Sequence, residues 1–179
     1  MSRHHTLATL SLLAVVGASV AACASARTQS FTERGANFQQ YTSFTWASKD
    51  ELATGDPRLD NNEFFRNRIQ ADVERALAER GYARDTSGAP GLIVHYHASV
   101  SQKIDVNAED RPYGYCQDCR SSVYSAGTIT IDLVDASSKR LIWRGWSEGS
   151  LDGIDSQTWL EQRVDGAVHD LMRTVPARR

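Results

Sequence analysis

Cys116 and Cys119 are separated by two residues in the segment YGYCQDCRSS, residues 113–122. Such a pair can form a structural disulfide, serve as a redox centre or supply half of a zinc site. The choice depends on the compartment, because disulfides persist outside the cytosol and are reduced inside it. The N-terminal sequence indicates that compartment.

The chain begins with the layout of a secretory signal. Arg3 opens a short basic region, and residues 7–20 are apolar or small and carry no charge. A membrane-spanning helix needs about 20 apolar residues, so this shorter run predicts a cleaved signal peptide over residues 1–22.

The signal ends in VAAC, residues 20–23, which resembles the lipobox of bacterial lipoproteins. The resemblance implies cleavage before Cys23 and lipid on its sulfur and amine, so the membrane is an expected partner. Several acyl chains would hold the protein firmly in the membrane, since each buried CH₂ contributes about 0.8 kcal/mol to membrane binding. Cys23 is followed by Ala24 and not by an aspartate, which implies that the lipoprotein is carried to the periplasmic face of the outer membrane. Residues 23–27 are the expected tether; a secretory signal with an incidental cysteine is the alternative.

Composition indicates one domain of near-neutral charge. The sequence holds 20 basic and 22 acidic residues, and removing residues 1–22 takes away Arg3 and no acid. The remaining net charge is about −3, too weak to attract nucleic acid, so no nucleic-acid partner is expected. About 150 residues remain, enough for one core, and we expect a single α+β domain over residues 28–175.

Five segments alternate apolar or β-branched residues with polar ones, which predicts strands. In the clearest, residues 91–100, the even-numbered apolar residues share one face, while His95 and His97 share the other. Residues 136–139 are turn formers and predict a hairpin. The predicted strands span residues 28–33, 41–47, 91–100, 127–135 and 140–149.

Two segments carry apolar residues at helical spacing. The first, residues 61–80, follows Asp60 as a predicted N-cap and precedes Gly81 as a predicted C-cap. The second follows Ser156 and ends before Pro176.

The predicted order is therefore β-β-α-β-β-β-α. We expect an α+β two-layer sandwich, an antiparallel sheet of about five strands with two helices packed on its one apolar face. The opposite face is predicted to carry His95, His97, Thr130, Asp132 and Arg144.

Residues 56–82, 91–100 and 127–149, behind a lipobox, resemble the bacterial lipoprotein family known as domain of unknown function 4136. The most specific pieces are the DLVD corner and the LIWRG strand in the last of these segments. The resemblance extends over nearly the whole mature chain and implies an envelope lipoprotein with an α+β domain. It supplies no catalytic residue, and the cysteine pair is not part of the family pattern.

In an exported protein, Cys116 and Cys119 meet an oxidising compartment. A disulfide between them would close a small loop and contribute about 2 kcal/mol before strain, which makes a local staple the favoured interpretation. A redox centre needs a lowered thiol pKa, but Asp118 beside the pair opposes thiolate formation and the motif lies in a predicted loop.

A zinc site formed by His95, His97, Cys116 and Cys119 is the third alternative. The two histidines project from one strand face. If that strand continues to Val106, its far end lies roughly 30 Å away, so the loop would have to fold back along the sheet.

Other sequence features do not predict catalysis. The sequence has no GxSxG elbow, HExxH helix or Gly-rich phosphate loop. Asp132 and Asp135 fall on opposite faces of their predicted strand and make a poor acid–base pair. Trp143 is expected in the core and Trp146 is expected to be partly exposed, where nearby tyrosines predict either an interaction patch or ordinary packing. Those tyrosines are Tyr113, Tyr115 and Tyr124.

Together these features predict a non-enzymatic lipoprotein of the cell envelope without a cofactor. Either its polar sheet face or its tyrosine-rich loop is expected to contact another envelope component. The alternative function is a periplasmic metal-binding module that uses His95, His97, Cys116 and Cys119.

Overall fold

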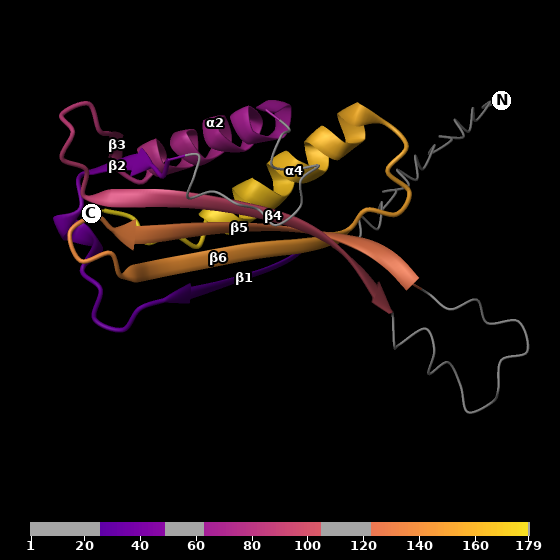
Figure 1. Cartoon of the computed structure of the whole chain (residues 1–179), viewed down its shortest axis with the longest axis horizontal. Helices are drawn as coiled ribbons and strands as arrows, with labels where there is room; N and C mark the ends of the chain where they lie inside the picture. Colours follow the sequence, from indigo (N-terminus) through magenta and orange to yellow (C-terminus); the bar gives the residue numbers. More distant parts are fainter. Residues whose placement is uncertain (1–25, 49–62, 105–122, 179) are drawn as a thin grey trace, which may run out of the picture.

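A computed structural model describes residues 26–48, 63–104 and 123–178 (Figure 1). Six strands form one sheet in the order β1-β6-β5-β4-β2-β3, and two α-helices pack against it. The strands are β1 (Arg27–Thr32), β2 (Ser43–Trp46), β3 (Ala83–Arg84), β4 (Leu92–Ile104), β5 (Val123–Asp135) and β6 (Leu141–Ser150); the helices are η1 (Phe38–Gln40), α2 (Glu63–Glu79) and α4 (Gln157–Met172).

The α+β class is confirmed, but the prediction of a purely antiparallel sheet was wrong: the sheet is mixed and has six strands, where about five were predicted. β1, β6, β5 and β4 are antiparallel in turn, whereas β2 is parallel to β4 and to β3. The cause is the connection through α2, since parallel neighbours need a crossover segment and a hairpin cannot supply one. The two-residue β3 adds a strand to the predicted order, which becomes β-β-α-β-β-β-β-α.

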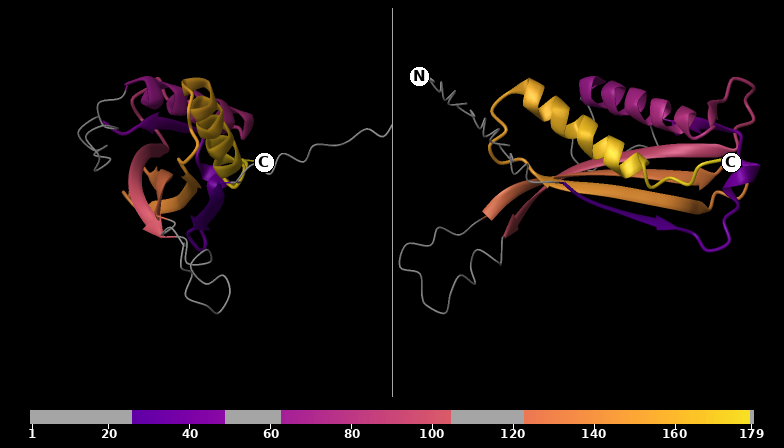
Figure 2. Two further views of the ribbon diagram at one scale, coloured as in Figure 1. Left: turned by 90° about the vertical axis from the view of Figure 1, so that its right-hand side faces the viewer. Right: turned by 180° about the vertical axis from the view of Figure 1, so that it is seen from behind.

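Both helices lie on the same side of the sheet (Figure 2). Each turns an apolar stripe toward the strands, and the buried side chains between the layers form one core. Fully buried members include Val73 and Leu77 of α2, Val168 and Leu171 of α4, and Leu92, Val94, Leu133 and Trp143 of the sheet.

Local sequence signals explain where α2 ends and where α4 begins. Gly81 adopts φ 88° after α2, and two backbone bonds close the helix: Gly81 N donates to Ala78 O and Tyr82 N donates to Leu77 O, both at 3.0 Å. This is the Schellman arrangement that a glycine permits. At the start of α4, the Ser156 hydroxyl accepts the N–H of Trp159 at 3.2 Å, which confirms the predicted cap.

The β5–β6 hairpin is organised by Asp135. Its carboxylate accepts the backbone N–H groups of Ser137 and Ser138 at 2.9 and 2.8 Å, and the Tyr41 hydroxyl at 2.7 Å. The Ser137 hydroxyl and these donors hold the pKa of Asp135 far below its usual range. The corner thereby ties the hairpin to the segment before β2, at the end of the sheet where β4 begins and β5 ends.

Candidate functional site: the open face of the sheet

The sheet face turned away from the helices carries the candidate site. Strand register places Asp132 of β5 beside His95 of β4 and Arg144 of β6, and the next row aligns Thr130 with His97 and Trp146. We call these six residues the open-face cluster. Paired residues of antiparallel strands project from the same face, so the predicted shared face of the histidines, Thr130, Asp132 and Arg144 is confirmed.

Asp132 and Arg144 form the centre of the open-face cluster. Asp132 is only 4% exposed, and its two oxygens accept Arg144 Nε at 2.7 Å and Nη2 at 2.5 Å. This two-bond geometry is the strongest form of a carboxylate–guanidinium contact, and the bond to Asp132 raises the pKa of Arg144. Both oxygens of the Asp132 carboxylate are therefore bonded to Arg144, while the Arg144 side chain is 45% exposed.

The two histidines lie next to this pair. The His95 and His97 rings stack with centroids 6.4 Å apart and planes at 10°. His97 Nε2 lies 3.8 Å from Asp132 Oδ2, beyond a hydrogen bond. Within the described ranges, no three His, Cys, Asp or Glu side chains are placed to share a metal ion. Cys116 and Cys119 lie outside those ranges, so the four-ligand metal site stays a prediction.

Some of the predictions about aromatic residues can be compared with the structure, and others fall on residues outside the described ranges. Trp143 is fully buried in the core, as predicted, and Trp146 is half-buried on the open face. Phe31 of β1 pairs with Arg144 and is 53% exposed, so it extends the open-face cluster toward the sheet edge. Cys23, the predicted disulfide Cys116–Cys119, Tyr113 and Tyr115 lie outside the described residues.

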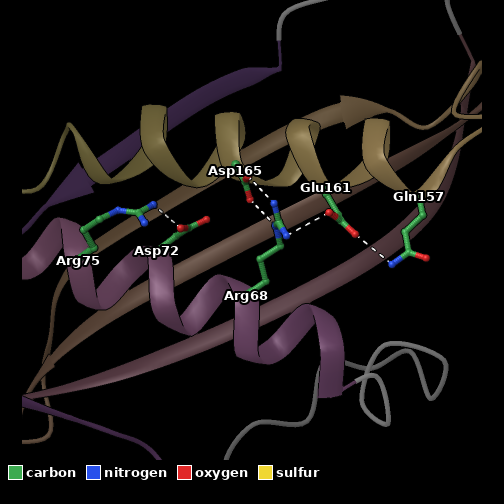
Figure 3. Close-up of polar contacts among 6 residues, drawn as sticks. All are labelled: Arg68, Asp72, Arg75, Gln157, Glu161 and Asp165. Atoms are coloured by element: carbon green, nitrogen blue, oxygen red, sulfur yellow. Dashed lines mark hydrogen bonds and ion pairs between the residues drawn. The ribbon is translucent and has the colours of Figure 1, made fainter.

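Sequence reasoning missed a charged network between the helices (Figure 3). Arg68 of α2 donates to both oxygens of Asp165 on α4, at 2.6 and 2.7 Å, and to Glu161 at 3.2 Å. Arg68 lowers the pKa of Asp165, whereas burial raises the pKa of Asp72, which lies next along α2 and pairs with Arg75. The sequence signal that could have predicted this network is the spacing of Glu161 and Asp165, which lie one helical turn apart. The network holds α2 against α4, and its charged side chains form ion pairs with one another.

The second missed feature is an apolar cavity of about 180 Å³ between the sheet and the N-terminal halves of both helices. Its lining is mostly hydrocarbon and includes Phe65, Ile69, Ala98, Leu160 and Val164. The cavity is formed where the helices meet the sheet, so no single sequence segment predicts it.

With this geometry in place, the family can be assigned. Residues 28–177 match the family model described as domain of unknown function DUF4136. The chain belongs to this family. The match confirms the resemblance seen in the sequence, and because the family has no known function it assigns no role to the open-face cluster.

Similarity to a solved structure with a TM-score above 0.5 supports the fold. A PDZ domain protein from Parabacteroides distasonis is similar, with a TM-score of 0.55 and 15% identity; the match covers 85% of this chain and 36% of that one. A PelC dodecamer from Paraburkholderia phytofirmans aligns with a TM-score of 0.48 and 10% identity over 86% of this chain and 99% of that one. No curated protein matches the sequence. In the described part of the chain, neither helix has the length and apolar character required to span a bilayer.

Proposed function

We propose that the protein is a lipid-anchored, non-enzymatic binding module on the periplasmic face of the bacterial outer membrane. The observation that carries the proposal is the two-faced sheet. The helices cover one face, whereas the other presents the ordered polar and aromatic side chains of the open-face cluster. The lipobox-like VAAC of residues 20–23 supports the anchor.

The chemistry of the open face favours a protein partner. Arg144 is neutralised by Asp132, and Lys103 farther along β4 is paired with Glu148. Among the described residues of this face, Arg27 opposite Glu148 is the remaining basic side chain, so positive charge is not concentrated there as a polyanion would require. It offers exposed Phe31, half-buried Trp146 and the accessible edge of the Arg144 guanidinium, and aromatic and arginine side chains are enriched in the centres of protein interfaces.

The same contacts argue against an acid–base role for the open-face cluster. A general base must reach the proton that it removes and must have a free acceptor. Asp132 is almost inaccessible and both of its oxygens accept from Arg144. It is too far from His97 to orient that ring by a hydrogen bond. The open-face cluster is thus better suited to contact than to catalysis.

The anchor is tested by mass spectrometry and fractionation of the protein from its native host. Wild type should begin at Cys23, carry acyl groups there and sediment with membranes. Cys23→Ser should lose the acyl mass and leave the membrane fraction, whereas Cys116→Ser, a matched change at another cysteine, should stay anchored. Wild-type protein that begins at Met1 and lacks acyl groups would overturn the proposal.

A further inference from the structure

The apolar cavity arises from a change of side-chain size along the core face of the sheet. Toward the β5–β6 hairpin this face carries large, fully buried residues, among them Leu133 and Trp143. Toward the other end it carries Ala98 and the paired glycines Gly127 and Gly149. The helices pass over both halves, so the small residues leave a space that the protein does not fill.

The lining makes this space suitable for hydrocarbon. Ile129 and Leu151 join the helix residues around it, and the Ser147 hydroxyl accepts a bond from Thr28 at 3.2 Å. An apolar cavity of this kind does not bind water well, because water needs two or more polar partners. A cavity of about 150 Å³ holds a benzene molecule, so about 180 Å³ accommodates roughly six carbons of an acyl chain.

The N-terminal end of the described chain lies at this cavity. Ala26 is part of the lining, and a Cβ placed on Gly149 would lie 3.5 Å from the Ala26 Cβ. Cys23 precedes Ala26 by three residues, which span at most about 11 Å. The attachment point of a lipid on Cys23 therefore lies within reach of the cavity.

Exposed aromatic rings mark the same end of the molecule. Phe64 is 45% exposed and Trp159 is 37% exposed. Each directly precedes a lining residue, Phe65 in α2 and Leu160 in α4. Tryptophan is enriched at the boundary between a bilayer and water, and Trp and Phe line the apolar face of helices that lie in this boundary. This end of the domain is thus suited to lie toward the membrane that holds the anchor.

We propose that the cavity holds the terminal segment of one acyl chain carried by Cys23 of the same molecule. This inference rests on the proposed lipidation of Cys23. The acyl segment would supply the dispersion contacts that the lining residues lack. One chain would be kept out of water whenever the anchor leaves a bilayer, while the others remain available for insertion.

The test uses full-length protein made in cells that incorporate a fatty acid with a photoreactive diazirine at its methyl end. After purification in detergent and irradiation, the acyl chain on Cys23 should become joined to peptides that contain residues 127–129 or 160–167 of the same molecule. Ala167→Leu fills the cavity and should reduce these products about tenfold. Ala71→Leu, the same change at an exposed position of α2, should leave them unchanged.

Gly127→Ala is a second variant in case Ala167→Leu does not fold. Its Cβ would lie 3.0 Å from Leu151 Cδ2 and narrow the cavity. Products that form on other segments, join two molecules or persist in the filled variants would overturn the cavity assignment and leave the lipid anchor standing. A Cys23 peptide without any acyl group would overturn the anchor and the cavity assignment together.

Discussion

Replacing Arg144 with methionine tests whether the open-face cluster is held together by its central ion pair. Arg144→Met keeps an unbranched side chain but removes both donors from Asp132. The remaining carboxylate is buried, with only 6% of its side chain exposed, and His97 Nε2 lies 3.8 Å away, beyond hydrogen-bond distance. A buried charge left without its partner is costly, because the carboxylate keeps its desolvation penalty and loses its compensation.

The magnitude follows from the exposure of the two partners. Breaking a fully buried pair costs about 3–5 kcal/mol, whereas exposed pairs contribute at most about 1 kcal/mol. Asp132 is buried but the Arg144 side chain is 45% exposed, so water can reach the vacated position. We therefore expect Arg144→Met to lower the free energy of unfolding by about 2–3 kcal/mol and Tm by roughly 5–10 °C.

The assay is urea unfolding of the Cys23→Ser protein, followed by tryptophan fluorescence, for each member of a double-mutant cycle. Asp132→Asn removes the charge, so the double variant Asp132→Asn/Arg144→Met should be more stable than Arg144→Met alone. The cycle should give a coupling energy of about 1–2 kcal/mol between the two positions. Additive effects, or a loss below about 0.5 kcal/mol for Arg144→Met, would refute a structural ion pair at this site.

Four further substitutions test the packing and the hairpin. Gly145→Ala would place a Cβ 2.5 Å from Cη2 of the buried Trp143 ring, so it should cost about 2–4 kcal/mol and change the near-UV circular dichroism. Gly166→Ala in α4, where nothing lies within 4 Å of the new Cβ, should instead stabilise by about 0.5–1 kcal/mol; equal effects at the two glycines would contradict the packing. Asp135 has a lowered pKa, so its contribution is complete above its unfolded pKa of about 4 and fades as the pH falls below that value. Asp135→Asn should therefore cost about 2 kcal/mol in urea unfolding at pH 7 and clearly less at pH 3, and a cost that does not change with pH would count against this assignment. Lys139 has φ 59°, so Lys139→Gly should raise the free energy of unfolding by up to about 1 kcal/mol, and a loss would show that its side chain contributes more than the strain costs.

The helices could be predicted from sequence because their signals are local. Residues 61–80 were predicted and α2 spans Glu63–Glu79, since the apolar spacing and Gly81 act within a few residues. The strand ends were harder to predict. β4 continues to Ile104 and β5 begins at Val123, beyond the clear alternation, because pairing between the two strands sustains the extension.

The sheet direction and β3 could not be predicted in the same way. β3 has only two residues, both exposed, and gives no periodic signal. The direction of β2 depends on where the chain returns after α2, and no pattern within β2 records that. Composition favours a strand but does not select its neighbour.

Prediction of the open-face cluster was also partial. Alternation along β4 and β5 placed His95, His97 and Asp132 on their common face. The bond between Asp132 and Arg144 depends on the register of β5 against β6, which the hairpin at Asp135 sets. The apolar cavity depends on two helices and three strands at once, and so it appears only in the folded domain.

Site-specific photocrosslinking in the native host tests the central claim, that the open face receives an envelope partner, most directly. A photoreactive amino acid at Thr130, in the middle of the open face, should give one discrete adduct in the membrane fraction. The same probe at Ala71, on the exposed side of α2, should not give that adduct. Adducts of equal yield from both positions, or none from Thr130 in protein that is acylated and membrane-bound, would contradict the claim.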